Sequence, residues 1–249
     1  MKRFALILLL SLFALSSCRK PVQLVLGTYN LHHCEPAEGG GRCYDSLATV
    51  LRQMAPDVVA LQELDSCNAR SAAFQADTLA KLCGMDYLYH RTIPFGDGSY
   101  GIGMLYKPGL NLVNTTFIPL PGEEPRGAIV AEFERFVYVC THFCHQSADN
   151  RTQSMDILGA LLTALYYKSD KPVFVAGDFN ATYVLEKNSS WEPFSSNEPT
   201  FSTPGTSARI EYILHLSATG NAKLLHSGTL SEAAGLSDHL PVFSTIRIR

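Results

Sequence analysis

The sequence of 249 residues lacks several features that would assign it at once to a common class of protein. It has no stripe of Lys and Arg residues, no internal repeat and no change of composition that marks a second domain. Its apolar runs are shorter than the roughly 20 residues of a membrane-spanning helix, and its cysteines and histidines lack the spacing of structural zinc sites. These absences count against a protein that tracks long nucleic acid, a membrane-spanning protein and a zinc module. With 46% apolar residues, the chain is long enough for one well-packed domain.

The N-terminus has the pattern of a secretion signal. Met1-Lys2-Arg3 precedes an apolar run from Phe4 to Leu15, and small residues follow. Leu15-Ser16-Ser17-Cys18 resembles a bacterial lipobox, so we expect residues 1–18 to be a lipoprotein signal with lipidation at Cys18. An ordinary cleaved signal and a short membrane anchor are the alternatives. The expected protein is a monomer that faces the periplasm or the cell surface, and its only expected membrane contact is through the lipid.

Loss of the signal leaves 18 basic and 23 acidic residues, a formal charge of −5. An acidic chain without a basic stripe lacks the charge expected of a general nuclease, although a local basic patch remains compatible with this net charge. Six cysteines remain after Cys18, which is compatible with disulfides outside the cytosol. Cys34 and Cys43 enclose a glycine-rich loop and are either a disulfide that restrains it or free thiols.

Apolar patterning predicts alternating strands and helices, and therefore an α/β or α+β chain. Asp45 is expected to cap a helix with a buried face at Leu47, Val50, Leu51 and Met54. Further helices are expected around Ala72–Cys83 and along the stripe of Met155, Leu158, Leu162 and Leu165, with Asp149 or Asn150 near the start of the second. The region from Asn188 to Thr206 is expected to be one long irregular loop. The expected strands are Val22–Tyr29, Val58–Leu61, Arg126–Phe133, Phe136–Cys140, Val173–Ala176, Arg209–Leu214 and Val242–Ile248.

Polar clusters stand at the ends of these predicted strands. They are Asn30, Gln62-Glu63, Thr141-His142, Gly177-Asp178-Phe179-Asn180 and Ser237-Asp238-His239. Strand ends converge at one edge of a sheet, so we expect these groups to share one cleft. Carboxylate and amide oxygens suit a hard divalent cation.

In this order, the five clusters resemble the endonuclease/exonuclease/phosphatase superfamily, which includes deoxyribonuclease I. The resemblance extends from Thr28-Tyr29-Asn30 to Ser237-Asp238-His239, and residues 19–249 are expected to form a single catalytic domain. It implies a four-layer sandwich of the deoxyribonuclease I-like type, in which two packed mixed β-sheets are flanked by helices. It also implies hydrolysis of a phosphate ester by an activated water, with Mg²⁺ or Mn²⁺ as cofactor.

The resemblance assigns a role to each motif residue. Glu63 is the primary metal ligand, aided by Asn30 and Asp238; alone, Glu63 would be a solvated acid and Asn30 a turn residue. Asp178 orients or deprotonates the attacking water, and Asn180 donates to the phosphate. Each has a structural alternative, which the occurrence of all five clusters in order makes less favoured.

The histidines divide into motif and loop residues. His239 supports the phosphate as charge builds, and His142 contacts it or protonates the leaving oxygen, although a core histidine is the alternative for His142. The loop histidines His32, His33 and His145 are also near the expected cleft, but lone loop histidines usually bind nothing.

Glu211 departs from the family pattern. Family members hold the last histidine with an aspartate, whereas this chain reads Arg209-Ile210-Glu211-Tyr212. The additional methylene of glutamate changes the reach to His239, so either activity or geometry is expected to differ. An inactive, anchored binding module is therefore one alternative function.

Substrate class depends on the loops rather than on the motifs. Arg126 and Arg151 are candidates for phosphate contacts, or are surface ion-pair residues. Ala176 and Ala181 stand where inositol phosphatases of the family have Trp and Arg, which counts against that branch. The expected substrate is a phosphate ester, most readily a phosphodiester, and an extracytoplasmic nuclease is a further alternative.

Overall fold

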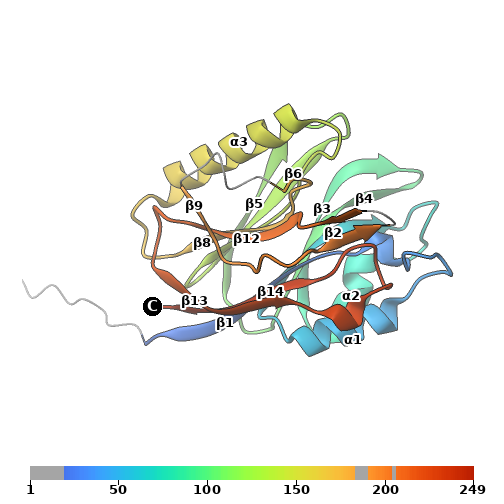
Figure 1. Ribbon diagram of the computed structural model, residues 1–249, viewed down its shortest axis with the longest axis horizontal. Helices are drawn as coiled ribbons and strands as arrows, with labels where there is room; N and C mark the ends of the chain where they lie inside the picture. Colours follow the sequence, from blue (N-terminus) through green and yellow to red (C-terminus); the bar gives the residue numbers. More distant parts are fainter. Residues whose placement is uncertain (1–19, 183–189, 204–205) are drawn as a thin grey trace, which may run out of the picture.

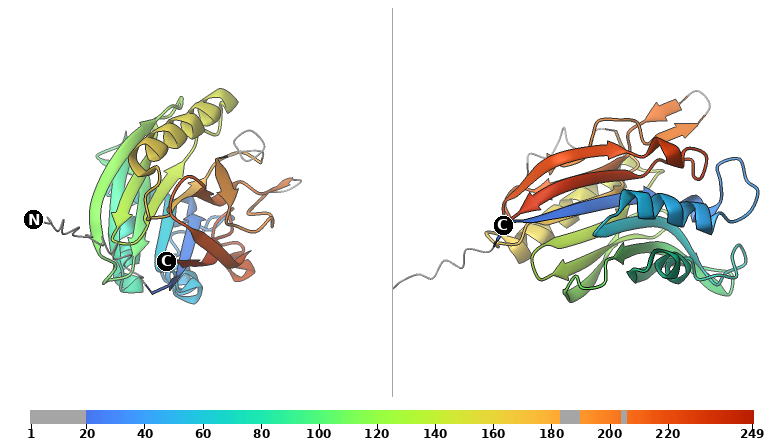
Figure 2. Two further views of the ribbon diagram at one scale, coloured as in Figure 1. Left: turned by 90° about the vertical axis from the view of Figure 1, so that its left-hand side faces the viewer. Right: turned by 90° about the horizontal axis from the view of Figure 1, so that it is seen from below.

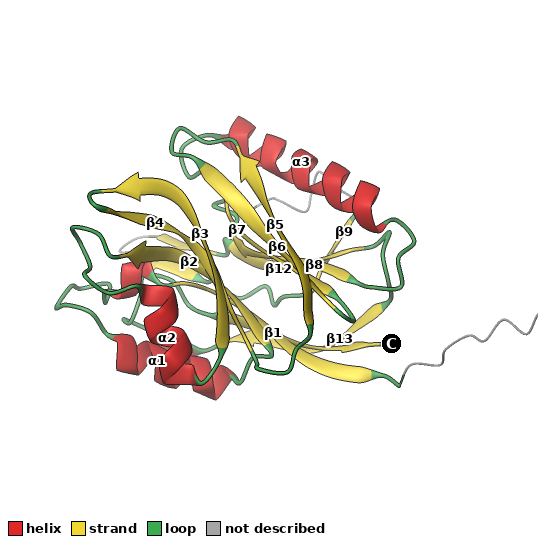
Figure 3. Cartoon of the chain, turned by 180° about the vertical axis from the view of Figure 1, so that it is seen from behind, coloured by secondary structure: helices red, strands yellow, loops and turns green. Residues whose placement is uncertain are grey.

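The computed structural model describes residues 20–182, 190–203 and 206–249, so Cys18 and the expected signal lie outside the described residues. Two six-stranded β-sheets pack face to face (Figure 1). Helix α3 (Ala148–Tyr166) covers the outer face of one sheet, and α1 (Tyr44–Met54) and α2 (Gln75–Cys83) cover the outer face of the other (Figure 3). The four-layer sandwich expected from the sequence is confirmed.

The first sheet has the strand order β13-β14-β1-β2-β4-β3, and the second has the order β5-β6-β7-β8-β12-β9. The strands of the first sheet are β1 (Val22–Asn30), β2 (Val58–Ser66), β3 (Asp86–Phe95), β4 (Gly98–Tyr106), β13 (Ala222–Thr229) and β14 (Val242–Ile248). Those of the second are β5 (Leu112–Leu120), β6 (Arg126–Phe133), β7 (Val137–His142), β8 (Val173–Asp178), β9 (Trp191–Pro193) and β12 (Glu211–Leu216). A small hairpin of β10 (Phe201–Thr203) and β11 (Thr206–Ala208) and the short 3₁₀ helices η1 (His32–Cys34) and η2 (Ser231–Ala233) complete the described elements.

Apolar residues that alternate along the strands fill the space between the sheets. Leu24 and Leu26 of β1 face Tyr138 and Phe174 of the second sheet, and all four are buried. Each buried side chain of this size contributes roughly 1.5–3 kcal/mol. The Tyr138 hydroxyl donates to the Gly27 carbonyl at 2.6 Å, so a polar contact also joins the sheets.

The start of β1 and the end of β14 lie together at one end of the molecule, where Val22 pairs with Ile248 (Figure 2). β1 then runs through the first sheet to Asn30, so the polar strand ends lie at the opposite end. Among the described helices, none has the length and apolar character needed to cross a membrane.

Helix ends differ in detail from the sequence predictions. The buried face of α1 is as expected, but Asp45 is not its cap, because the helix begins at Tyr44 and follows Cys43 without a side-chain cap. Ser147 caps α3, since its hydroxyl accepts the N–H of Asn150 at 3.2 Å. Asp149 and Asn150 lie near the start of the helix, as expected, and the cap is the serine that precedes it.

One further expectation is wrong, and one alternative that the sequence left open is decided. The expected irregular loop contains β9 and β10 in its described part, because Trp191 is buried against the second sheet and Phe201 pairs with Ala208. The described cysteines are all free, so no disulfide joins Cys34 to Cys43. The glycine-rich loop is instead closed by backbone pairing, in which the Cys43 N–H donates to the Cys34 carbonyl at 3.0 Å.

Candidate active site

Polar residues from both sheets meet at the end where β1, β7 and β8 terminate. Asn30, His142 and Asp178 are the last residues of these strands. β7 and β8 run parallel, and their register sets His142 beside Asp178. The Asn30 Nδ2 donates to Asp178 Oδ2 at 3.1 Å across the two sheets. Packing of the sheets thus brings together residues 148 positions apart in the chain.

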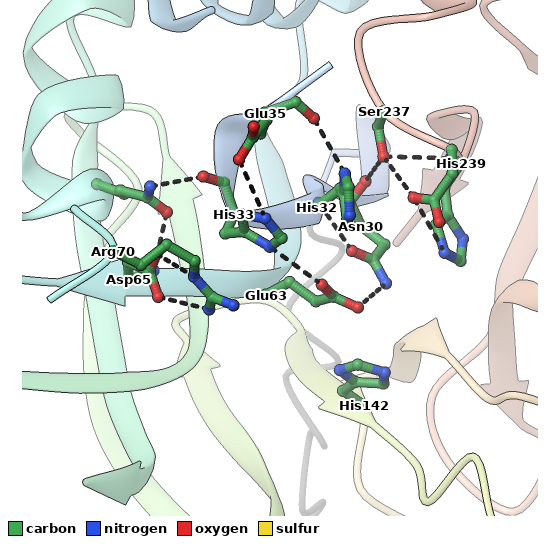
Figure 4. A network of polar contacts seen from close by, with 12 residues as sticks. Asn30, His32, His33, Glu35, Glu63, Asp65, Arg70, His142, Ser237 and His239 are labelled. Atoms are coloured by element: carbon green, nitrogen blue, oxygen red, sulfur yellow. Dashed lines mark hydrogen bonds and ion pairs between the residues drawn. The ribbon is translucent and has the colours of Figure 1, made fainter. Parts of the chain in front are cut away.

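Glu63 lies in a β-bulge inside β2 rather than beyond the end of the strand. The pairing of β2 with β4 shifts between Leu61 and Leu64, and Glu63 has a left-handed φ of 60°. A bulge redirects the side chain of its extra residue. Here the Glu63 carboxylate lies between His33 and Asn30 (Figure 4), and Asn30 Nδ2 donates to its Oε1 at 3.0 Å.

The surroundings of Glu63 favour its ionised form. Burial raises the pKa of Glu63, but contacts with His33 and Asn30 and the positive charge of His239 outweigh burial and hold the pKa well below its usual range. His33 Nδ1 lies 3.8 Å from Glu63 Oε2. Sequence reasoning did not single out this contact, because it depends on left-handed backbone at His32, His33 and Cys34, which no residue pattern signals.

Asp178 is the centre of the arrangement. Three nitrogen atoms surround its Oδ2: Asn30 Nδ2 at 3.1 Å, His142 Nε2 at 3.5 Å and His239 Nε2 at 4.0 Å. Burial and then the negative charge of Glu211 raise the pKa of Asp178 to about 7. A carboxylate with a pKa near the ambient pH is suited to accept a proton from water.

Glu211 reaches His239 despite its longer side chain. It lies directly opposite Asp178 in the antiparallel pair of β8 and β12, and it is fully buried. Its Oε1 accepts a hydrogen bond from His239 Nδ1, so the contact that the family aspartate would make is present. Glu211 Oε2 has no partner among the described residues.

The two buried histidines differ in charge at neutral pH. Burial lowers the pKa of His239, but the charge and hydrogen bond of Glu211 outweigh burial and raise it to about 10. Burial and the nearby guanidinium of Arg126 lower the pKa of His142 to about 3. His239 is therefore an imidazolium and His142 a neutral imidazole, which is the kind of separation found where two residues have different catalytic roles.

The remaining predicted site residues lie at different distances from the group around Asp178. Asp238 Oδ1 is 3.7 Å from His239 Nε2, and its side chain is 28% exposed. Asn180 Nδ2 donates to the Phe143 carbonyl at 3.1 Å, so this amide supports the segment after β7. Arg126 Nη1 lies 3.4 Å from His142 Nδ1. Arg151 instead donates hydrogen bonds to the backbone carbonyls of Cys144 and His145 and makes none with the residues around Asp178 among the described contacts.

The donor groups fit a hard divalent cation. Glu63 and Asp238 supply carboxylates and Asn30 an amide oxygen, which is the oxygen-rich set that Mg²⁺ and Mn²⁺ prefer. The Asn30 Oδ1 accepts the His32 N–H at 3.1 Å and retains a second lone pair. A buried group of Asp178, Glu211 and His239 also has ligand atoms within 4.8 Å of one another, but one of these contacts is the Glu211–His239 hydrogen bond. Metal ligation by Asn30, Glu63 and Asp238 stays a prediction.

Comparisons with known proteins agree with this geometry. The model of the Endonuclease/Exonuclease/phosphatase family matches residues 27–239, a range that contains every strand-end motif. A comparison with curated protein sequences finds no match.

Solved structures share the fold at low sequence identity. An endonuclease/exonuclease/phosphatase family protein from Bacteroides thetaiotaomicron has a TM-score of 0.75 and 17% identity, over 92% of this chain and 99% of that chain. A mannosyl-6-phosphatase of the same species has a TM-score of 0.68 and 18% identity, over 90% and 99%. ANGEL2, a 2',3'-cyclic phosphatase, has a TM-score of 0.72 and 14% identity, over 91% and 95%. At these identities the likeness establishes the fold alone.

Proposed function

Because the chain belongs to the endonuclease/exonuclease/phosphatase family, we propose that it is a divalent-metal-dependent hydrolase of phosphate esters. The observation that carries the proposal is the set of three nitrogen atoms around Asp178 Oδ2, contributed by Asn30, His142 and His239. Such a set positions a carboxylate and also offers hydrogen-bond donors to phosphate oxygens beside it.

In this proposal, each residue acts from its observed position. Asp178 orients the attacking water and accepts its proton, and the imidazolium of His239 stabilises the charge that builds on the phosphate. Glu211 keeps His239 protonated and oriented. Glu63, Asn30 and Asp238 would hold the cation, which when bound polarises the phosphate and lowers the pKa of water. The route is a direct displacement without a covalent enzyme intermediate.

The proposed reaction leaves open whether the substrate is a phosphate monoester or a diester. One neighbour in fold is named a mannosyl-6-phosphatase and another a 2',3'-cyclic phosphatase, so the fold accommodates both monoesters and cyclic diesters. We propose a phosphodiester as the first substrate to test. The inactive binding module is less favoured, because the Glu211 departure that motivated it leaves the contact with His239 intact.

We also propose that a lipid at Cys18 anchors the protein with its active site directed away from the membrane. The nine residues of β1 separate Val22 from Asn30 by about 26 Å at the usual rise of a strand. Residues 19–21 can span at most about 11 Å. The short tether and the distance of the active site from the anchored end favour a water-soluble ester.

Reconstituted full-length protein is expected to hydrolyse a soluble diester but not the phospholipids of its own vesicle. Hydrolysis of those phospholipids alone would contradict this orientation.

The test of the proposed activity is hydrolysis of bis-p-nitrophenyl phosphate and p-nitrophenyl phosphate by the full chain with Mg²⁺, Mn²⁺ or EDTA. Cation-dependent turnover is expected for the wild type and is expected to fall by roughly 10²–10³ in His239→Ala. His226→Ala is the matched control, because His226 is an exposed histidine on β13. Equal turnover in the wild type and His239→Ala would refute the assigned chemistry.

A further inference from the structure

Arg126 contacts two histidines at the rim of the site. Its Nη1 lies 3.4 Å from His142 Nδ1, and its Nη2 lies 3.2 Å from His145 Nδ1. The side chain is 5% exposed, and Glu124 Oε1 lies 3.0 Å from Nη1. The guanidinium thus contacts one carboxylate and two imidazoles.

The chemistry of these groups determines where the proton of His142 resides. A guanidinium has only N–H donors and stays charged in proteins. A donor that faces Nδ1 requires a lone pair on Nδ1, because a protonated Nδ1 would set two donors against each other. A neutral imidazole without a proton on Nδ1 carries it on Nε2. His142 Nε2 is the atom that lies 3.5 Å from Asp178 Oδ2.

We propose that Arg126 is a positioning residue that holds His142 in its neutral Nε2–H tautomer, so that His142 donates a hydrogen bond toward the reacting phosphate. His142 is then a hydrogen-bond donor and does not protonate the leaving oxygen, and Arg126 acts through His142 instead of binding the phosphate itself. The catalytic part of this assignment rests on the proposed function, whereas the tautomer is a property of the folded chain alone.

Three further observations support this assignment. His142 is buried and ends β7, so its ring has little freedom to turn to another partner. Arg126 begins β6, and its neighbour Gly127 pairs with His142 across the strands. Burial and the positive charge of Arg126 together hold the pKa of His142 low, in keeping with a neutral ring.

The direct test is long-range ¹H–¹⁵N correlation spectroscopy of the ¹⁵N-labelled full chain at pH 7 with EDTA. The His142 signals are assigned by their absence in His142→Gln. The wild type is expected to show one proton, on Nε2. Arg126→Met is expected to add the Nδ1–H tautomer or the doubly protonated ring, and Arg126→Lys, which keeps a single cationic donor, is expected to give a smaller change. A wild-type His142 protonated on Nδ1 would overturn the assignment.

Arg151→Met is the matched control, because Arg151 is a nearby arginine whose hydrogen bonds among the described residues go to backbone carbonyls. It is expected to leave the His142 tautomer unchanged. Dispersed amide spectra establish that each variant folds, and if Arg126→Met does not fold, Arg126→Lys decides alone. An unchanged tautomer in every folded Arg126 variant would also overturn the assignment.

Kinetics separate positioning from phosphate binding. If Arg126 acts through His142, Arg126→Met is expected to lower kcat roughly 10-fold with a small change in KM, a smaller loss than the 10²–10³ expected when the donor itself is removed in His142→Ala. A large rise in KM with normal kcat would identify Arg126 as a phosphate ligand and overturn the assignment. If no ester is hydrolysed, the proposed function fails while the tautomer measurement still decides the role of Arg126.

Discussion

Removing the charge of Glu211 is expected to change how stability depends on pH. Glu211 and His239 are both buried and share a hydrogen bond, and Glu211 raises the pKa of His239 to about 10. Glu211→Gln retains the shape and one acceptor oxygen but loses the charge. The substitution therefore removes the charge that raises the pKa of His239, and with it one of the two causes that raise the pKa of Asp178.

The raised pKa of His239 predicts that the unfolding free energy decreases as the pH rises. Folding favours the protonated imidazole, so its stabilisation is complete below pH 6.5, the ordinary value, and is lost as the pH rises toward 10. One proton changes the unfolding free energy by at most about 1.4 kcal/mol per pH unit. Between pH 7 and pH 9 the wild type should therefore lose up to roughly 3 kcal/mol through His239. Asp178, with its pKa raised to about 7, changes charge mainly below this window.

The assay is urea unfolding of the wild type and Glu211→Gln in EDTA at intervals from pH 7 to pH 9. The wild-type curve is expected to fall more steeply, and Glu211→Asp, which keeps the charge, is the control expected to restore most of the slope. Titrating groups that do not feel the charge of Glu211 are common to all three proteins and cancel in the comparison. The pKa of Asp178, which Glu211 also raises, lies at the lower edge of this pH window. Parallel curves for the wild type and Glu211→Gln would refute the idea that Glu211 keeps His239 charged.

Three other substitutions or reactions test the fold. In the native protein a thiol reagent is expected to modify exposed Cys67 quickly, whereas Cys140, which is fully buried and has a pKa raised to about 12, should react only on unfolding; mass spectrometry of the labelled peptides measures both rates. Gly177→Ala is expected to destabilise by more than about 3 kcal/mol or prevent folding, because an added Cβ would lie 1.9 Å from the Thr141 carbonyl oxygen; near-normal urea unfolding would contradict this. Ser147→Ala is expected to cost about 1 kcal/mol of unfolding free energy through loss of the α3 cap, with an unchanged midpoint as the contrary result.

Local patterns in the chain determined the main elements and the positions of most candidate site residues. The α1 face and the β6–β7 hairpin follow from residue spacing, because a helix or a hairpin depends on neighbours in sequence. Asn30, His142 and Asp178 end their strands as the apolar runs indicated. The exact caps did not follow from the pattern, since Cys43 and not Asp45 precedes α1 and the cap of α3 is Ser147.

The tertiary structure alone decided how these residues act on one another. The bulge at Glu63 and the left-handed turn at His33 create a carboxylate contact that no sequence spacing signals. The reach of Glu211 to His239 depends on the register of β12 against β8, and the contact of Arg126 with His142 depends on the pairing of β6 with β7. Sequence identifies residue types and their place on an element, whereas distance, burial and therefore pKa are set by how separate elements pack.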